Sequence, residues 1–103
     1  MSTEVTDRPE RKRYEIAEDG TTVGYVTYQV APDSIELLHT EVDRAHAGRG
    51  LAGIMVQAVL DDARSRHLAV IPHCPYVAKF IDEHREYLDL VPPGRRAQFG
   101  LDG

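Results

Sequence analysis

Residues 43–66 read DRAHAGRGLAGIMVQAVLDDARSR, a polar, glycine-rich turn that leads straight into a long apolar segment. From Leu51 to Arg66 most positions are apolar, and the polar ones recur at the spacing of one helical face, namely Gln57, Asp61, Arg64 and Ser65. The pattern predicts a helix over this range. Because its polar face is narrow, we expect the helix to pack deeply against a sheet.

Three segments that precede the turn have the pattern of β-strands. Tyr14 and Ile16 alternate with charged residues, and residues 23–30 are rich in β-branched and aromatic side chains. A third segment, residues 34–42, follows the break at Pro32-Asp33. Since short turns join the three segments, we expect them to pair as antiparallel neighbours.

The chain after the long helix contains one more strand and one more helix. Residues 68–71 form a short apolar segment that Pro72 ends, and residues 75–83 have a helical pattern. This order predicts an α/β fold with a mixed sheet, an antiparallel strand meander followed by helix–strand–helix, in which the long helix connects parallel strands. We predict one domain over residues 13–92, a disordered lead over residues 1–12 and a polar tail over residues 93–103.

Bulk properties exclude several classes of function. A length of 103 residues fits one domain. The formal net charge of −5 argues against a nucleic-acid-binding surface, and no apolar run approaches the roughly 20 residues of a membrane helix. With a polar N-terminus, a single cysteine and five histidines that lack the spacing of a zinc site, the sequence predicts a cytoplasmic protein without a disulfide framework or a metal.

The glycine-rich turn has the features of a phosphate site. Gly48 and Gly50 allow the backbone to approach a ligand closely, and the turn opens a helix whose first N–H groups and positive dipole end favour an anion. Arg44 and Arg49 add positive charge. A turn that is merely tight, with no ligand, explains the same glycines equally well, because short glycine motifs are often structural.

Two better-known phosphate motifs do not fit. Gly48, Gly50 and Gly53 spell G-x-G-x-x-G, but in a dinucleotide site the first glycine ends a strand at once, whereas here residues 43–47 intervene. The next strand ends in Ile71-Pro72-His73, without the acidic residue that would bind a ribose. A P-loop is excluded because no Gly-Lys-Ser/Thr follows the turn.

Four segments together resemble the GNAT superfamily of N-acetyltransferases, in particular its small, minimal members. They are residues 39–42 (HTEV), 48–52 (GRGLA), 71–77 (IPHCPYV) and 87–91 (YLDLV). The resemblance spans Tyr14 to Val91 and implies acetyl-coenzyme A as the ligand. It implies that the amides of Ala47 to Ala52 bind the pyrophosphate and that the pantetheine arm follows the strand that ends at Val42. The implied binding residues are Val42, Ala47, Gly48, Arg49, Gly50, Leu51 and Ala52.

The sequence departs from the family pattern at several positions. Ala45 stands where the pyrophosphate signature usually begins with Gln or Arg. Larger members carry an Asn at the start of the last helix and a Tyr about two turns later, where this chain has Cys74 and Ile81. The chain also has no room for the N-terminal helices that shape an acceptor pocket, so the resemblance implies an open acceptor site.

Cys74 precedes Pro75, so it is a candidate N-cap of the last helix, where the dipole favours a thiolate. Such a thiolate could accept an acetyl group and pass it to an amine; the alternatives are a thiol that only lines the thioester site or a buried, inert one. In the rival mechanism the amine attacks the thioester directly, and His39 or Glu41, which share a strand face opposite Thr40, removes its proton. Tyr76 is a candidate proton donor.

The sequence therefore predicts an acetyltransferase that moves an acetyl group from acetyl-coenzyme A to an amine. The acceptor stays open among a protein lysine, an N-terminus and a small amine. A non-catalytic acyl-coenzyme A binding or sensing module is the alternative, because the family's usual tyrosine and acceptor helices are missing. A plain interaction domain without a ligand is a third possibility.

Overall fold

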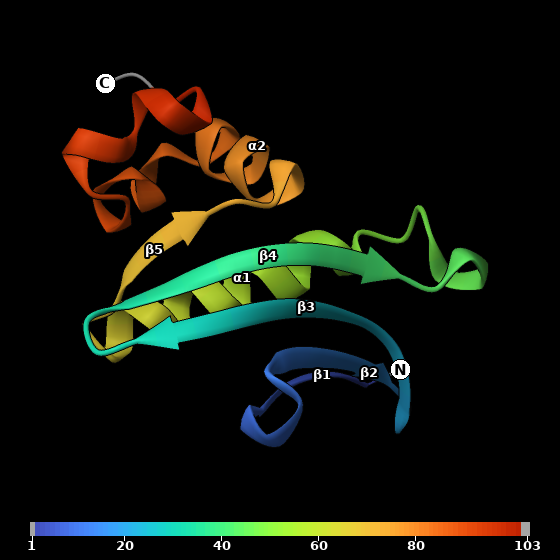
Figure 1. The fold of residues 1–103 in the computed structure, drawn as a ribbon. Helices are drawn as coiled ribbons and strands as arrows, with labels where there is room; N and C mark the ends of the chain where they lie inside the picture. Colours follow the sequence, from blue (N-terminus) through green and yellow to red (C-terminus); the bar gives the residue numbers. More distant parts are fainter. Residues whose placement is uncertain (1, 102–103) are drawn as a thin grey trace.

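The computed structural model describes residues 2–101 and contains one five-stranded sheet with helices packed on it (Figure 1). The strands are β1 (Thr3–Arg8), β2 (Arg13–Glu18), β3 (Thr21–Ala31), β4 (Ser34–Val42) and β5 (Ala69–Pro72), and they lie side by side in this order. Neighbours from β1 to β4 are antiparallel, whereas β4 and β5 are parallel. The predicted mixed sheet is confirmed.

Two α-helices cover hydrophobic surface of the sheet. Helix α1 (Leu51–Ser65) links β4 to β5 and lies behind the sheet in Figure 1, and α2 (Pro75–Glu83) follows β5. The face of α1 turned toward the sheet is buried, and its residues include Met55, Val56, Val59 and Leu60. The predicted helix ranges therefore agree with the structure to within one residue. No helix among residues 2–101 has the length and apolar character needed to cross a membrane.

The N-terminal residues are part of the sheet, so the predicted disordered lead is wrong. Thr3 to Arg8 form β1, which pairs with β2 in a register that places Val5 opposite Ile16. Val5 is the one apolar residue of this strand that packs against the core. A single apolar residue among polar ones gives no recognisable alternation, so the strand depends on backbone pairing with β2 rather than on a pattern of its own.

The C-terminal residues also fold back, so the predicted polar tail is wrong. Residues 93–95 and 97–99 form short 3-10 helices, and the side chain of Leu101 is fully buried in the core. The Arg96 guanidinium donates a hydrogen bond to the backbone oxygen of Val91 at 3.0 Å, and the Leu101 N–H donates to the oxygen of Arg96 at 2.8 Å. Isolated apolar residues at wide spacing have no helical or strand period, so sequence periodicity does not reveal them.

A bulge in β4 determines which of its side chains share a face. Thr27 of β3 lies opposite His39 and Tyr28 lies opposite Leu37, so Leu38 is an extra residue without a partner in β3. Residues of a strand normally alternate between faces, and the extra residue reverses the alternation. As a result Thr40, opposite Val26, joins the buried face of Leu37.

Candidate functional site

The glycine-rich turn leaves the sheet at the end of β4. A short 3-10 helix, Arg44–His46, follows Asp43, whose carboxylate accepts a hydrogen bond from the Ala45 N–H at 3.4 Å. Gly48 and Gly50 then adopt left-handed conformations, with φ of 83° and 76°. Side chains strain such a backbone, and no other atom lies within 4 Å of where a Cβ would stand at either position. Both glycines therefore expose bare backbone to open space.

Helix α1 begins without a side-chain cap. Gly50 is its N-cap and supplies no side-chain hydrogen bond, and the first helical bond runs from the Ile54 N–H to the Gly50 oxygen at 3.1 Å. The N–H groups of Leu51, Ala52 and Gly53 come before Ile54 in the first turn of α1. N–H groups in the first turn of a helix have no carbonyl partner within the helix. Together with the helix dipole, these N–H groups favour an anion.

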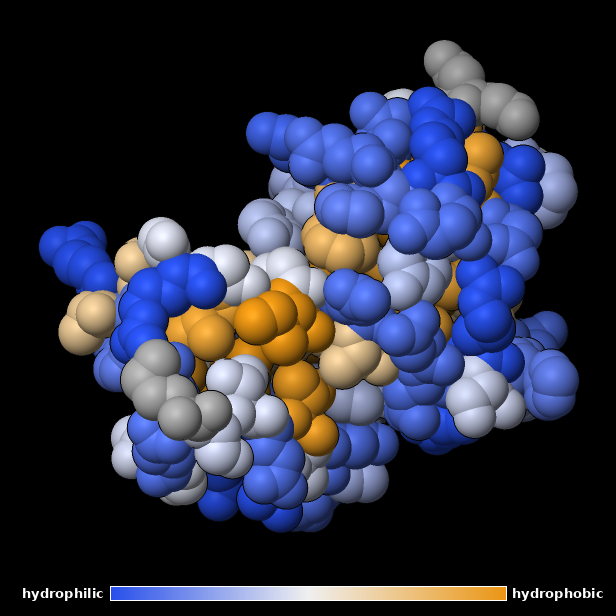
Figure 2. Space-filling model, turned by 180° about the vertical axis from the view of Figure 1, so that it is seen from behind, coloured by the Kyte–Doolittle hydropathy of each residue, from blue (hydrophilic) through white to orange (hydrophobic). Residues whose placement is uncertain are grey.

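A hollow of about 300 Å³ lies directly against this turn. Its lining contains all but one of the binding residues that the resemblance implies, together with two others, and comprises Val42, His46, Ala47, Gly48, Gly50, Leu51, Ala52 and Tyr76. Tyr76 comes from the first turn of α2, so the hollow lies between α2 and the turn. From behind, hydrophobic surface gathers on the half of the molecule that carries the turn (Figure 2).

Arg49 is the implied binding residue that does not line the hollow. Its guanidinium donates a hydrogen bond to the Glu18 carboxylate of β2 at 2.9 Å. His46 Nε2 lies 3.8 Å from the same carboxylate, so Glu18 holds two residues of the turn. Sequence analysis did not find Glu18 or His46, and Glu18 could not be found because the contact joins positions 31 residues apart.

His46 carries an unusual atom at the edge of the hollow. Within residues 2–101, its Nδ1 is the buried side-chain nitrogen or oxygen that has no hydrogen-bond partner. A carboxylate oxygen of Asp43 lies 3.8 Å from it, beyond hydrogen-bond distance. Buried polar atoms normally have a partner, and His46 itself is one of the residues that line the hollow.

Beyond the turn, β4 has a free edge. The parallel pairing of β4 with β5 ends at Leu37 and Pro72, whereas β4 continues to Val42. The last backbone bond between the two segments runs from the Cys74 N–H to the Leu37 oxygen at 2.9 Å. From there the chain turns into α2, so β4 and β5 part. Residues 38–42 thus present the unpaired groups of an edge strand on the side away from β3.

Cys74 lies at the point where the strands part. It is the N-cap of α2, as the sequence predicts, and its side chain is buried. Its sulfur donates a hydrogen bond to the hydroxyl oxygen of Thr40 at 3.4 Å. Thr40 belongs to the buried face of β4, so the thiol reaches the strand edge from the side of the core.

His39 and Glu41 lie on the other face of β4, away from Cys74. Both are exposed; His39 Nε2 lies 3.5 Å from Glu41 Oε1, and the Tyr25 hydroxyl donates to Glu41 Oε2 at 2.9 Å. These bonds, first that from Tyr25 and then that from His39, lower the pKa of Glu41. A carboxylate with a lowered pKa is a weaker base, so the geometry disfavours Glu41 as a proton acceptor.

Tyr76 lines the hollow close to the first turn of α1. A side chain at Gly53 of α1 would lie 3.8 Å from the Tyr76 hydroxyl. Burial, with a smaller contribution from the charge of Glu83, raises the pKa of Tyr76 above its ordinary value. The hydroxyl therefore stays protonated at neutral pH, as a proton donor must.

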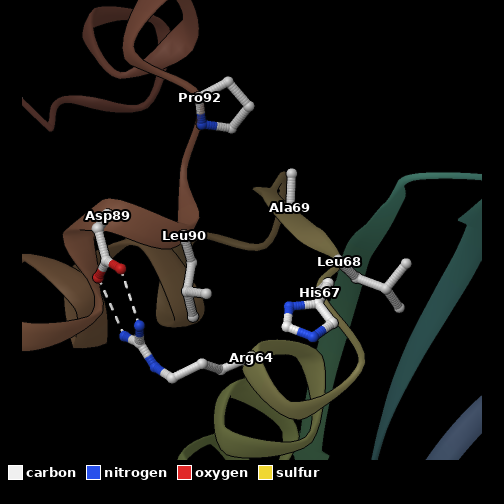
Figure 3. A pocket seen from close by; sticks show the side chains of 7 residues that line it. All are labelled: Arg64, His67, Leu68, Ala69, Asp89, Leu90 and Pro92. Atoms are coloured by element: carbon white, nitrogen blue, oxygen red, sulfur yellow. Dashed lines mark hydrogen bonds and ion pairs between the residues drawn. The ribbon is translucent and has the colours of Figure 1, made fainter.

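A larger hollow, about 380 Å³, contains none of the candidate site residues that the sequence predicts. It lies between the end of α1, the start of β5 and the turn after α2, and is lined by Arg64, His67, Leu68, Ala69, Asp89, Leu90 and Pro92 (Figure 3). Two hydrogen bonds from Arg64 to the Asp89 carboxylate, at 2.8 and 3.0 Å, span it. We interpret this bidentate pair as a structural link between α1 and the C-terminal part of the chain.

The fold and the site together are those of an α/β domain with a glycine-rich helix start that lacks a side-chain cap and with an open strand edge. The model of the GCN5-related N-acetyl-transferase family matches residues 13–90 of this chain. The chain belongs to that family, as the sequence motifs predicted.

Curated relatives match over part of their length. Protein NATD1 of Bos taurus is 36% identical over 61 residues, which are 57% of this chain and 54% of that protein. Protein NATD1 of Danio rerio is 33% identical over 64 residues, 60% of this chain and 58% of that protein. The chain thus spans little more than half the length of the curated relatives it matches.

Solved structures share the fold. A GCN5-like protein from Staphylococcus aureus superimposes with a TM-score of 0.66 at 22% identity, covering 86% of this chain and 87% of that one. The ribosomal-protein-alanine N-acetyltransferase of Brucella melitensis gives a TM-score of 0.56 at 22% identity, covering 78% of this chain and 61% of that one. The ribosomal-protein-S18-alanine N-acetyltransferase of Escherichia coli gives 0.54 at 20% identity, covering 56% and 38%.

Proposed function

We propose that this chain transfers the acetyl group of acetyl-coenzyme A to an amine. One observation carries the proposal: an uncapped helix start with two left-handed glycines faces a hollow beside the free edge of β4. Membership of the GCN5-related family supports the same reading. The open space over Gly48 and Gly50 fits a polar ligand pressed against the turn.

In this proposal the pyrophosphate binds at the turn. The amides from Ala47 to Ala52 surround it, and the positive end of α1 stabilises its charge. Arg49 adds a positive charge at the rim while it stays paired with Glu18. The pantetheine arm, which carries amide groups, then pairs with the free edge of residues 38–42 in the manner of an added strand.

The acyl end lies where β4 and β5 part. Cys74 lies on one side of this point. Tyr76, which follows it by two residues in α2 and whose raised pKa keeps its hydroxyl protonated, is the candidate donor of a proton to the leaving thiolate. Two routes are open at this position. In one the thiolate of Cys74 takes the acetyl group from the thioester and gives it to the amine; in the other the amine attacks the thioester directly.

The proposed reaction requires an amine as the acceptor. The Escherichia coli and Brucella melitensis structures are named for acetylation of an alanine in a ribosomal protein. A peptide with a free N-terminal alanine is therefore the first acceptor to test, followed by a lysine peptide and a polyamine. The acidic chain, with its net charge of −5, favours a cationic acceptor through long-range attraction.

The test is calorimetry with acetyl-coenzyme A, followed by intact mass of the same sample and by an acceptor assay. Binding with a gain of one acetyl group, absent in Cys74→Ala, supports the covalent route. Binding without that gain, together with turnover of an amine, supports direct transfer. Tight binding without turnover of any amine in the panel supports a sensing module. No binding overturns the proposal.

A further inference from the structure

His73 forms a hydrogen bond with Glu36 at the point where β4 and β5 part. It follows Pro72, the last paired residue of β5, and precedes Cys74. The imidazole Nε2 lies 2.8 Å from Glu36 Oε1, the side chains being 35% and 37% exposed. Of the carboxylate–histidine pairs in residues 2–101, those of His39 and His46 are longer, at 3.5 and 3.8 Å.

We propose that His73 is the general base that takes the proton of the acceptor amine, and that Glu36 orients it. This inference rests on the proposed acetyl transfer and adds the residue that prepares the acceptor. Sequence analysis placed neither residue in the site.

The pairing determines which nitrogen is the base. A carboxylate only accepts hydrogen bonds, so Nε2 carries the hydrogen and donates it to Glu36. The lone pair is then on Nδ1, which is the nitrogen able to take a proton. A second contact holds the ring, because Phe99 lies against it edge-on, with ring centres 5.5 Å apart and planes at 80°. Oriented imidazoles of this kind are the commonest general bases in enzymes.

The bulge at Leu38 places the imidazole and the thiol on opposite sides of the strand edge. Glu36 lies opposite Gln29 and Thr40 lies opposite Val26, so the two β4 residues belong to different faces. Cys74 bonds to Thr40, and His73 bonds to Glu36. A thioester held at this edge therefore has the thiol on its core side and the imidazole on its open side, from which an amine can approach.

Few charged groups surround the imidazole. From β4, Glu36 contacts it directly. From the C-terminal segment, Arg95 lies 5.8 Å from the centre of the Phe99 ring and donates a hydrogen bond to Gln98 at 3.2 Å. The pair of His39 and Glu41 also belongs to the open face of β4, beyond the bulge. The carboxylate of Glu36 is thus the charge that stabilises the protonated ring during transfer.

The proton balance is simple. The nitrogen of the neutral amine forms a bond to the carbonyl carbon of the thioester, and its N–H proton passes to Nδ1 of His73. The C–S bond breaks, and the coenzyme thiolate takes up one proton, for which Tyr76 is the donor in the proposal above. The imidazolium then releases its proton to water, which re-protonates Tyr76. The same base serves an amine that attacks an acetylated Cys74.

The experiment compares His73→Asn with the wild type in a steady-state assay with acetyl-coenzyme A and an amine acceptor, over pH 6 to 9. We expect kcat to fall about 100-fold, the lower end of what general-base catalysis contributes, while the Kd for acetyl-coenzyme A stays within twofold. Free imidazole should restore part of the rate. His67→Asn is the matched control. It changes an exposed histidine just after the C-terminal end of α1, outside the proposed site, and should keep the wild-type kcat.

Glu36→Gln tests the positioning role separately. We expect kcat to fall about tenfold while the KM for the acceptor stays within twofold, because a neutral amide holds the Nε2–H of the ring less strongly than a carboxylate does. A loss of rate in either variant counts only if the Kd for acetyl-coenzyme A and the melting temperature are unchanged. Wild-type kcat and pH profile in His73→Asn overturn this inference alone. A wild-type chain that binds the coenzyme but acetylates no amine overturns the proposed transfer and this base with it.

Discussion

The two ends of the free β4 edge offer different kinds of groups to a ligand. At the turn, the groups are backbone amides, exposed because Gly48 and Gly50 are left-handed and α1 lacks a cap. Where β4 and β5 part, the groups are side chains: the Cys74 thiol and the His73 imidazole. A backbone site depends on local conformation, whereas a side-chain site depends on which strands lie together. The two ends should therefore respond differently to substitution.

The largest effect is expected at the turn. Gly50→Glu puts a negative charge at the proposed pyrophosphate site and a side chain on a backbone with φ of 76°, so we expect acetyl-coenzyme A binding to weaken at least 100-fold. Calorimetry measures this. Gly94→Glu is the control, because Gly94 is equally open and has no left-handed conformation. Binding within threefold of wild type in Gly50→Glu would make the turn purely structural.

At the other end, a change should affect turnover rather than binding. In Cys74→Ala the Kd for acetyl-coenzyme A should stay within twofold, since the small, buried thiol bonds only to Thr40 in the structure. We expect kcat to fall at least tenfold if the thiol carries the acetyl group. Steady-state kinetics and intact mass measure the two quantities. Unchanged turnover would assign Cys74 to packing beneath α2.

Tyr76 lines the hollow at the turn, and in the proposal it also donates a proton at the acyl end. A substitution at Tyr76 therefore tests whether one residue serves both ends of the β4 edge. Tyr76→Phe should lower kcat about tenfold with little change in Kd, because water can replace a lost proton donor in part. A general acid must be protonated, so its rate falls as pH rises through its pKa. Burial raises the pKa of Tyr76 from 10.0, so the wild-type rate should show no decline from this group below about pH 10. A tyrosine-dependent decline near pH 8 would contradict the assignment.

The smallest effect is expected for the charge at the rim. Arg49→Gln removes a half-exposed guanidinium that is already paired with Glu18. Exposed charges contribute up to about 1 kcal/mol, so we expect a Kd about threefold to fivefold weaker, with the difference shrinking as salt rises. Titrations at two salt concentrations check this. A loss as large as that in Gly50→Glu would mean that the side chain, rather than the backbone, dominates the turn.

Most of the sheet and both helices could be predicted from the sequence. The long helix has an apolar period over four turns, and the meander has short turns between β-rich segments, so each element carries its own signal. β1 and the C-terminal segment could not be predicted, because they contribute only isolated apolar side chains to the core, Val5 from β1 and Phe99 and Leu101 from the C-terminal segment. The conformation of such a segment depends on the part of the fold against which it packs, and not on a pattern in its own sequence.

The candidate site also has one part that the sequence predicts and one part that it does not. The turn from Ala47 to Ala52 was predictable, because two glycines before a helix produce exposed amides whatever the rest of the chain does. The hydrogen bond between Glu36 and His73 was not, because it joins residues 37 apart in the sequence and requires β5 to lie beside β4. Glu18 was missed for the same reason.

The sequence by itself determined the order of the elements from β2 to α2, the exposed amides of the glycine-rich turn and the position of Cys74 before the last helix. The hydrophobic period, the conformation of glycine and the placement of proline depend on a few neighbouring residues, so the sequence alone reveals them. Only the tertiary structure decided which side chains face one another at the β4 edge. The unpaired Leu38 reverses the alternation of the strand, and it thereby separates Thr40 with Cys74 from Glu36 with His73.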